Sequence, residues 1–164
     1  MFSVGSFVSY RAEGVCEITD IRNENFGTVG KDTLYYILSP IHDKKSTFFV
    51  PVDNEKLVSM MRKLLSADEI GALIEEQKGV ATNWISDSKQ RASYFREVLS
   101  LGERHELILL VRAVSEFERT QAALGRKVYT TDLSAKERAA KLLLDEFSVT
   151  LPITGLDELY EMIL

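Results

Sequence analysis

The fold class is decided by Ser46-Thr47-Phe48-Phe49-Val50-Pro51-Val52-Asp53-Asn54, where one periodicity ends and another begins. Up to residue 52 the stretch is rich in β-branched and aromatic residues, which is typical of a strand. Beyond it the apolar residues recur at the spacing of a helix face, as Leu57, Met61, Leu64 and Leu65. The sequence therefore predicts an α+β protein with a β-rich domain over 1–54 and an all-α domain over 55–164.

Toward the N-terminus the same strand pattern repeats. Strands are predicted at 6–10, 15–21, 33–38 and 46–52, with the apolar residues of 15–21 at every second or third position. Gly, Asn and Asp clusters at 23–27 and 30–32 read as turns. This pattern predicts a small curled antiparallel sheet or barrel, and a sheet of this size is expected to pack on the helical part of the chain.

Toward the C-terminus, capping signals and helical spacing predict further helices. Ser66 and Glu69 form a capping box that opens a helix to about Gln77. A second box is predicted at Leu133-Ser134-Ala135-Lys136-Glu137, for a helix that ends before Pro152. The remaining helices are expected from Trp84 to about Gly102, from about 107 to a stop at Gly125, and over 156–164.

Composition excludes several classes of protein. The 164 residues carry a net charge of −5 and a single cysteine, Cys16, so no internal disulfide forms. The chain has neither a run of eighteen apolar residues nor a secretion signal, so we expect a cytosolic protein without a membrane partner. Residues 78–141 hold twelve Lys and Arg against eight Asp and Glu, whereas 142–164 hold five acids and no base. Local phosphate contact is compatible with this distribution; strong non-specific nucleic-acid binding is not.

No constellation of residues indicates an enzyme. His42 and His105 have no cysteine or second histidine at a metal-ligand spacing. Gly27-Thr28-Val29-Gly30 reads as a turn rather than a phosphate-binding loop. We therefore expect a binding protein without a cofactor, a metal or a small-molecule substrate.

The segment Ala81-Thr82-Asn83-Trp84-Ile85-Ser86 contains the only tryptophan. We expect Trp84 in the first turn of its helix, with Thr82 or Asn83 as the cap. On a helical wheel Trp84 lies about 60° from the centre of the stripe formed by Ile85, Ala92, Phe95 and Leu99. Two interpretations remain open: a packing residue between helices, which is the commoner use of a large aromatic, or a ring presented outward as a wedge.

Several motifs together resemble the CarD/CdnL transcription regulators, over about residues 1–150. In the β-rich part they are the opening from Phe2 to Val15, with Gly5, Val8, Tyr10 and Gly14, then Tyr35-Tyr36-Ile37-Leu38 and Phe49-Val50-Pro51-Val52. In the helical part they are Thr82-Asn83-Trp84 and Leu133-Ser134-x-x-Glu137-Arg138. The resemblance implies a Tudor-like polymerase-interacting domain, shared with the transcription-repair coupling factor, followed by a helical domain.

The resemblance also implies a mechanism. Family members hold the β subunit of bacterial RNA polymerase and place the helical domain on promoter DNA at the upstream edge of the bubble. Their tryptophan enters the minor groove and stabilises the open complex, as apolar wedges do at unstacked steps. The implied polymerase contacts are Glu24 and Phe49, where some relatives carry arginine. The implied DNA contacts are Thr82, Asn83, Trp84 and Lys89.

Further basic residues are candidates for phosphate contact: Arg91, Arg96, Arg126 and Lys127. Each of them can equally belong to a solvated helix face paired to acids such as Glu97 and Glu103. Phe49 can equally belong to the core of the sheet. The alternative function is a protein-only adaptor that docks on polymerase or a repair factor without touching DNA, which the acidic total and Asp87 favour.

Overall fold

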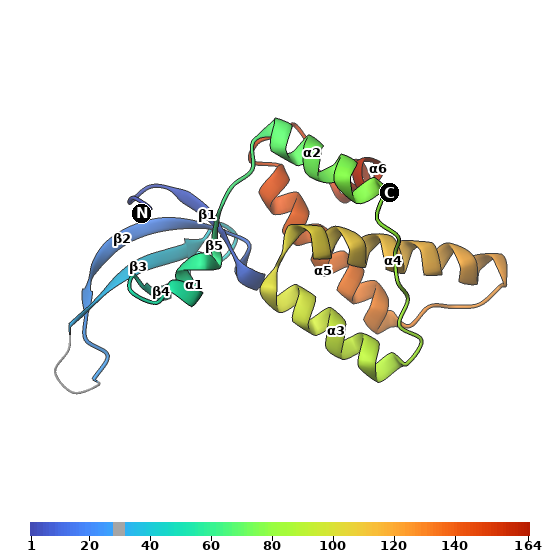
Figure 1. Cartoon of the computed structure of the whole chain (residues 1–164), viewed down its shortest axis with the longest axis horizontal. Coiled ribbons are helices and arrows are strands. Elements are labelled where there is room, and N and C mark those ends of the chain that lie inside the picture. The colour runs from blue at the N-terminus through green and yellow to red at the C-terminus, as the bar shows by residue number, and fades with distance from the viewer. Residues whose placement is uncertain (28–31) are drawn as a thin grey trace. The chain divides into compact units, whose positions relative to one another are not determined.

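The computed structural model describes residues 1–27 and 32–164, and it contains two compact units, Met1–Leu64 and Leu65–Leu164. The first is a five-stranded sheet and the second is built from helices, so the α+β prediction is confirmed (Figure 1). Part of the predicted turns at 27–30 and 30–32 lies outside the described residues. No helix of the described ranges has the length and apolarity needed to cross a bilayer.

The sheet of the first unit is antiparallel, in the order β4-β3-β2-β1-β5. β1 (Phe7–Tyr10) leads through a 3-10 turn, η1 (Arg11–Glu13), into β2 (Val15–Glu24). Gly14 ends that turn with φ of 70°, a conformation that favours glycine. β3 (Thr33–Pro40) and β4 (Phe48–Pro51) complete the predicted strands. Within the described residues β4 and β5 are not paired, so the sheet is open rather than a closed barrel.

A β-bulge explains the irregular spacing of apolar residues in β2. The register with β3 shifts between Ile18 and Asp20, which adds one residue to the strand. The bulge restores Ile21 to the core face three positions after Ile18, and both side chains pack in the same cluster. The other buried members of this core are Val8, Tyr10, Cys16, Tyr36, Leu38, Val50 and Met61.

The predicted helix after Asn54 is wrong beyond its first turn. A short helix, α1 (Glu55–Ser59), is capped by the Asn54 side chain, and β5 (Met61–Lys63) comes after it. β5 pairs with β1, with Met61 opposite Tyr10 and buried in the sheet core. The compact unit therefore ends at Leu64 rather than at residue 54, because the sheet recruits its fifth strand from the segment that we assigned to the helical domain.

The second unit contains five helices: α2 (Ala67–Lys78), α3 (Ser88–Leu101), α4 (Arg104–Ala123), α5 (Thr130–Phe147) and α6 (Leu156–Ile163). The Ser66–Glu69 capping box is present as predicted. Gly125 comes after α4 with φ of 66°, and the N–H groups of Gly125 and Arg126 donate to the oxygens of Ala122 and Gln121. These bonds form a Schellman motif, which confirms the predicted stop.

Two of the predicted helix starts are wrong. α5 begins at Thr130, so Ser134 lies inside the helix and Glu137 pairs with Lys141 instead of forming a box. α3 begins at Ser88, because the Asp87 carboxylate accepts a hydrogen bond from the N–H of Gln90 at 2.8 Å. A carboxylate is a strong cap that also favours the positive end of the helix, so Asp87 outcompetes Thr82 and Asn83.

The core of this unit lies among all five helices. Its largest fully buried side chains include Ile70, Ile108, Leu143, Phe147 and Leu159. α5 packs along α4 and also contacts α3 and α6 (Figure 1). Arg104 of α4 donates to the Glu146 carboxylate of α5 at 2.6–3.0 Å, so a largely buried ion pair joins these two helices.

Candidate nucleic-acid and polymerase interfaces

Trp84 lies in an extended connection between α2 and α3, not in a helical turn. Side chains of the neighbouring helices hold this connection in place. Arg112 of α4 donates to the carbonyl oxygen of Gln77 and, at 3.1 Å, to that of Val80. Thr82, which we expected to be a cap, hydrogen-bonds instead to the Glu116 carboxylate of α4. The end of α2 and the first half of the connection are therefore fastened to α4.

The indole of Trp84 is stacked between two groups. The ring of Phe117 lies parallel to it, with centroids 3.9 Å apart and an interplanar angle of 11°. The guanidinium carbon of Arg91 lies 4.5 Å from the indole centroid. A parallel ring at this distance leaves no room for a guanidinium on the same face, so Phe117 and Arg91 cover opposite faces. Phe95 contacts the indole edge-on, with centroids 6.4 Å apart.

Trp84 is half-buried, so it is neither a fully buried packing residue nor a ring presented freely to solvent, the two interpretations left open by the sequence. Its side chain packs against the helical core without being part of the fully buried cluster. Phe95 and Leu99 of the predicted helical stripe are buried in that core. Ile85 of the same stripe is only half-buried. Since both faces of the indole are covered, the surface that remains exposed belongs to the edge of the ring.

Arg91 is placed differently from the expected phosphate contact. Its side chain is only 3% exposed, as is that of Asp132 in α5. Its Nε and Nη2 atoms donate to the two Asp132 oxygens at 3.1 and 2.9 Å. Its Nη1 atom donates to the carbonyl oxygens of Ile85 and Ser86 at 2.7 and 3.3 Å. A guanidinium buried and engaged in this way does not face a phosphate; it fixes the Trp84 segment to α3 and α5.

The buried charge of Arg91 is compensated by its neighbours. A bidentate pair with a carboxylate offsets the cost of burying both charges, and the two carbonyl oxygens satisfy the donors of Nη1. The guanidinium then lies over the indole and, at 5.9 Å, over the ring of Tyr129, which is 65% exposed. Sequence reasoning missed Phe117, Asp132 and Tyr129, because their distance from Trp84 along the chain gives no local signal.

The other predicted basic residues face solvent. Lys89 and Arg96 are exposed on α3, and Arg126 and Lys127 are exposed in the connection between α4 and α5. Within the described residues none of the four side chains makes an ion pair, including with the acids that we considered as partners. Asn83 is exposed and, with Thr82, lines a cavity of about 290 Å³ between the connection and α4.

On the first unit, Phe49 belongs to an aromatic group rather than to the core of the sheet. Its ring meets those of Phe26 and Tyr35 edge to face, with centroids 4.9 and 6.2 Å apart, and Phe26 is 59% exposed. Glu24 lies at the end of β2 and accepts a hydrogen bond from Nε of Arg22 at 2.6 Å. The two predicted contact residues are thus set on β4 and β2.

The two strands that carry these contact residues each have an open edge. β4 is the terminal strand of the sheet, and among the described residues it pairs with β3 alone. β2 pairs with β1 over Val15–Glu17, and no described strand pairs with its outer edge from Asp20 to Glu24. Unpaired strand edges are templates for binding another strand.

The two histidines are exposed and lie in a turn and on α4. His105 lies 3.5 Å from the Glu106 carboxylate. Across residues 1–27 and 32–164, no three His, Cys, Asp or Glu side chains are grouped as metal ligands would be.

Comparison with known families gives one match, to the CarD-like/TRCF RID domain, over residues 2–65. No curated protein matches the chain. The matched range coincides with the compact unit Met1–Leu64, including the fifth strand that the sequence pattern had concealed. The N-terminal unit of this chain is therefore a CarD-like/TRCF RID domain.

Proposed function

We propose that the chain is a non-enzymatic transcription regulator that binds the β subunit of bacterial RNA polymerase and promoter DNA at the upstream edge of the bubble. The observation that carries this proposal is the RID match over one complete compact unit. The first unit would bind the polymerase and the helical unit would bind DNA. The resemblance of the Trp84 segment to the family's wedge supports the second role.

The polymerase contact would form by addition of a partner strand to β4 or to the free edge of β2. Main-chain hydrogen bonds of the open edge would supply affinity, and side chains would supply selectivity. Glu24 and the aromatic group of Phe26, Tyr35 and Phe49 supply one charge and one apolar surface beside these edges. Large aromatics of this kind are typical anchors of protein interfaces.

The DNA contact would use the edge of the Trp84 indole as a wedge. A ring held on both faces loses little conformational entropy on binding, because its rotamer is already fixed. Insertion at a step that is already unstacked costs less than insertion into intact duplex. Exposed cations on α3 and before α5, namely Lys89, Arg96, Arg126 and Lys127, would contact phosphates and set the register.

The decisive experiment compares Trp84→Ala with the wild-type protein in polymerase binding and in the lifetime of the promoter open complex. We expect unchanged polymerase binding and a shortened lifetime, because the unstacked step is no longer filled. Tyr129→Ala is the matched control, since it removes an exposed aromatic ring next to the same arginine. Equal lifetimes for the Trp84 variant and the wild-type protein, with both folded, would contradict the wedge.

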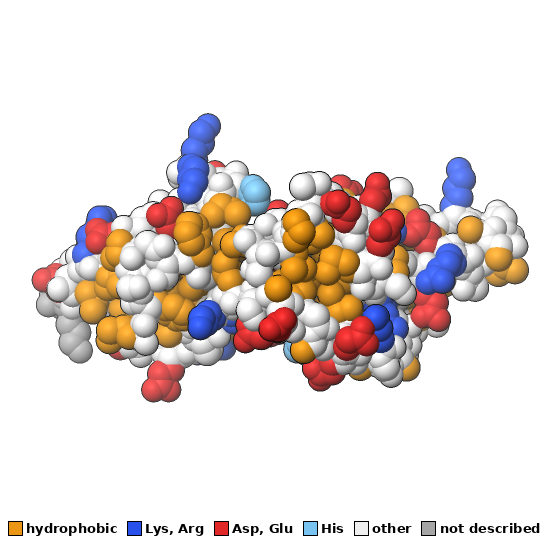
Figure 2. All heavy atoms as spheres, turned by 90° about the horizontal axis from the view of Figure 1, so that it is seen from above, with side chains coloured by type: hydrophobic (Ala, Val, Ile, Leu, Met, Phe, Trp, Pro, Cys, Tyr) orange, Lys and Arg blue, Asp and Glu red, His pale blue; other side chains and the backbone are white. Residues whose placement is uncertain are grey.

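The second candidate is the protein-only adaptor. The α2 and α6 helices pack together and carry Asp68, Glu69, Glu75, Glu76, Asp157, Glu158 and Glu161. Figure 2 views the helical unit from this side and shows many acidic side chains there. Such a surface repels phosphates and fits a basic protein partner. Polymerase binding without any effect of Trp84→Ala or of salt on promoter DNA would favour this function.

A further inference from the structure

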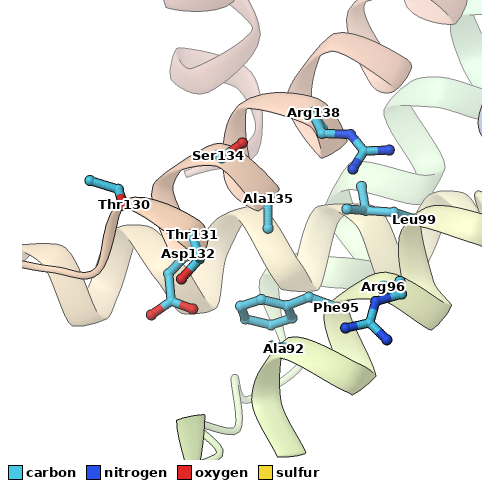
Figure 3. A pocket seen from close by; sticks show the side chains of 10 residues that line it. All are labelled: Ala92, Phe95, Arg96, Leu99, Thr130, Thr131, Asp132, Ser134, Ala135 and Arg138. Atoms are coloured by element: carbon cyan, nitrogen blue, oxygen red, sulfur yellow. The ribbon is translucent and has the colours of Figure 1, made fainter. Parts of the chain in front are cut away.

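A cleft of about 500 Å³ in the helical unit lies between α3 and the first three turns of α5. Ala92, Phe95 and Leu99 form its apolar floor, and Ala135 lies opposite. Figure 3 shows Arg96 from α3 and Arg138 from α5 on either side of Leu99, toward one end of the cleft. Thr130, Thr131 and Asp132 lie toward the other end.

The two arginines of this cleft are the observation that points to a ligand. Both are exposed, and within the described residues neither makes an ion pair or a hydrogen bond to a side chain. Exposed arginines such as Arg119 also lack such a partner in the described part of the chain, so what distinguishes these two is that they line one cavity from different helices. Two guanidinium groups from different helices that line the same cavity attract an anion, and their planar donors match phosphate oxygens.

The rest of the lining agrees with an anionic ligand. The one carboxylate in the cleft, that of Asp132, is neutralised by its bidentate bonds to Arg91. Hydroxyl groups of Thr130, Thr131 and Ser134 lie along α5. The N-cap of this helix, Tyr129, provides no side-chain acceptor for the first N–H groups. Donors therefore outnumber free acceptors around the cavity.

We propose that this cleft binds a phosphate group at the end where Arg96 and Arg138 lie, with these two arginines as its ligands. The phosphate can come from a DNA backbone or from a free phosphorylated molecule, since the same donors recognise both. For the DNA source the inference rests on the proposed function; for the free source it stands alone. Arg138 is then a functional residue that spacing alone did not single out.

The position of the cleft relates it to Trp84. Asp132 lines the cleft and also holds Arg91 against the indole. A DNA phosphate bound here would fix the backbone close to the wedge, which is how phosphate contacts set register. Lys89, seven residues before Arg96, lies on the same face of α3 and would extend the basic track.

The test uses the full chain, with pyrophosphate and a forked DNA as separate probes. Amide NMR shifts locate binding, and Arg96→Gln and Arg138→Gln are compared with Arg119→Gln, which removes an exposed arginine of α4 outside the cleft. We expect shifts in the amides around Arg96, Leu99 and Arg138, and about a tenfold loss of affinity for each cleft variant, as for a lost charge-assisted bond. Unchanged melting temperatures for the three variants show that folding is not the cause.

The results with the two probes distinguish a DNA backbone phosphate from a free phosphorylated molecule as the ligand. Forked DNA that moves the same amides and competes with pyrophosphate assigns the cleft to the DNA backbone. Pyrophosphate binding without DNA binding keeps the cleft and refutes the proposed DNA role. DNA binding that depends on Trp84 but equals the wild type in both cleft variants refutes the cleft as a site for DNA phosphates and leaves the proposed function in place. The absence of amide shifts with both probes, or equal losses in Arg119→Gln, overturns the phosphate site.

Discussion

At the scale of single residues, Arg91 connects most parts of the candidate site. Its guanidinium joins α3 to α5 through Asp132, binds the Trp84 connection through two carbonyl oxygens, and covers one face of the indole. Its expected phosphate role depended on solvent exposure, which a partner 41 positions away removes.

We predict that Arg91→Ala lowers the free energy of unfolding by about 3–5 kcal/mol, because it leaves the Asp132 carboxylate buried and unpaired. Urea unfolding measures this loss. The double variant Arg91→Met/Asp132→Leu is the control: it removes both charges, so most of the stability should return. A loss below about 1 kcal/mol for the single variant, the value of a surface ion pair, would mean that the pair is not buried in solution.

Cys16 gives a prediction of pH dependence. The side chain is fully buried, and burial, with a smaller contribution from the charge of Glu13, raises the pKa of the thiol from 9.0 to about 12. The folded protein therefore binds more protons than the unfolded chain between these values, so its stability falls as the pH rises from 9 toward 12. Cys16→Ser would reduce this slope.

The same thiol should resist iodoacetamide at pH 8 in the folded protein and react on unfolding in urea, because the thiolate is the nucleophile. The labelled fraction can be followed by mass spectrometry. Rapid labelling of the native chain would show that the sheet core opens readily.

At the scale of elements, the start of α3 determines where Trp84 lies. If the helix began at Trp84, as expected, the indole would project from a helical turn. Asp87 delays the helix, and the preceding connection becomes an extended segment held by side chains from α3 and α4. Both Thr82 and Asn83 are acceptable caps in isolation, but Thr82 hydrogen-bonds to Glu116 and the Asp87 carboxylate caps the helix instead.

We predict that Asp87→Ala costs about 1 kcal/mol, the usual value of an N-cap, and also alters the fluorescence of Trp84. Ser66→Ala removes the cap of α2, and should cost a similar amount without changing the emission spectrum. Because Trp84 is the only tryptophan, the comparison is direct. Identical spectra for the two variants would indicate that the connection keeps its form without the α3 cap.

At the scale of the whole molecule, the chain consists of two units, each with its own apolar core. The first core includes Met61 of β5, which lies beyond the boundary that the change of periodicity suggested. Completion of the sheet therefore requires residues that the local pattern assigned to a helix.

We predict that a chain of residues 1–64 folds as an isolated unit, whereas a chain of residues 1–54 does not. The shorter chain lacks the strand that covers β1 and loses Met61, Leu57 and Val58 from the sheet core. Since a domain of about sixty residues is only marginally stable, these losses are decisive. Circular dichroism and amide dispersion in NMR spectra distinguish the two, and a folded 1–54 chain would show that β5 is dispensable.

The sequence by itself determined the fold class, the strands β1 to β4, the capping box of α2, the Schellman stop of α4 and the family of the N-terminal domain. These features depend on neighbours within a few residues, or on an ordered series of motifs, so the sequence pattern alone is enough to recognise them.

Only the tertiary structure decided that Met61–Lys63 is a strand, that Trp84 stands in an extended connection between Phe117 and Arg91, and that Arg138 joins Arg96 at one cleft. A strand of three residues is too short to show a periodic pattern of apolar residues, and its conformation is set by pairing with β1. A buried ion pair or an aromatic stack joins residues distant in the chain, and helix packing alone brings them within a few ångströms.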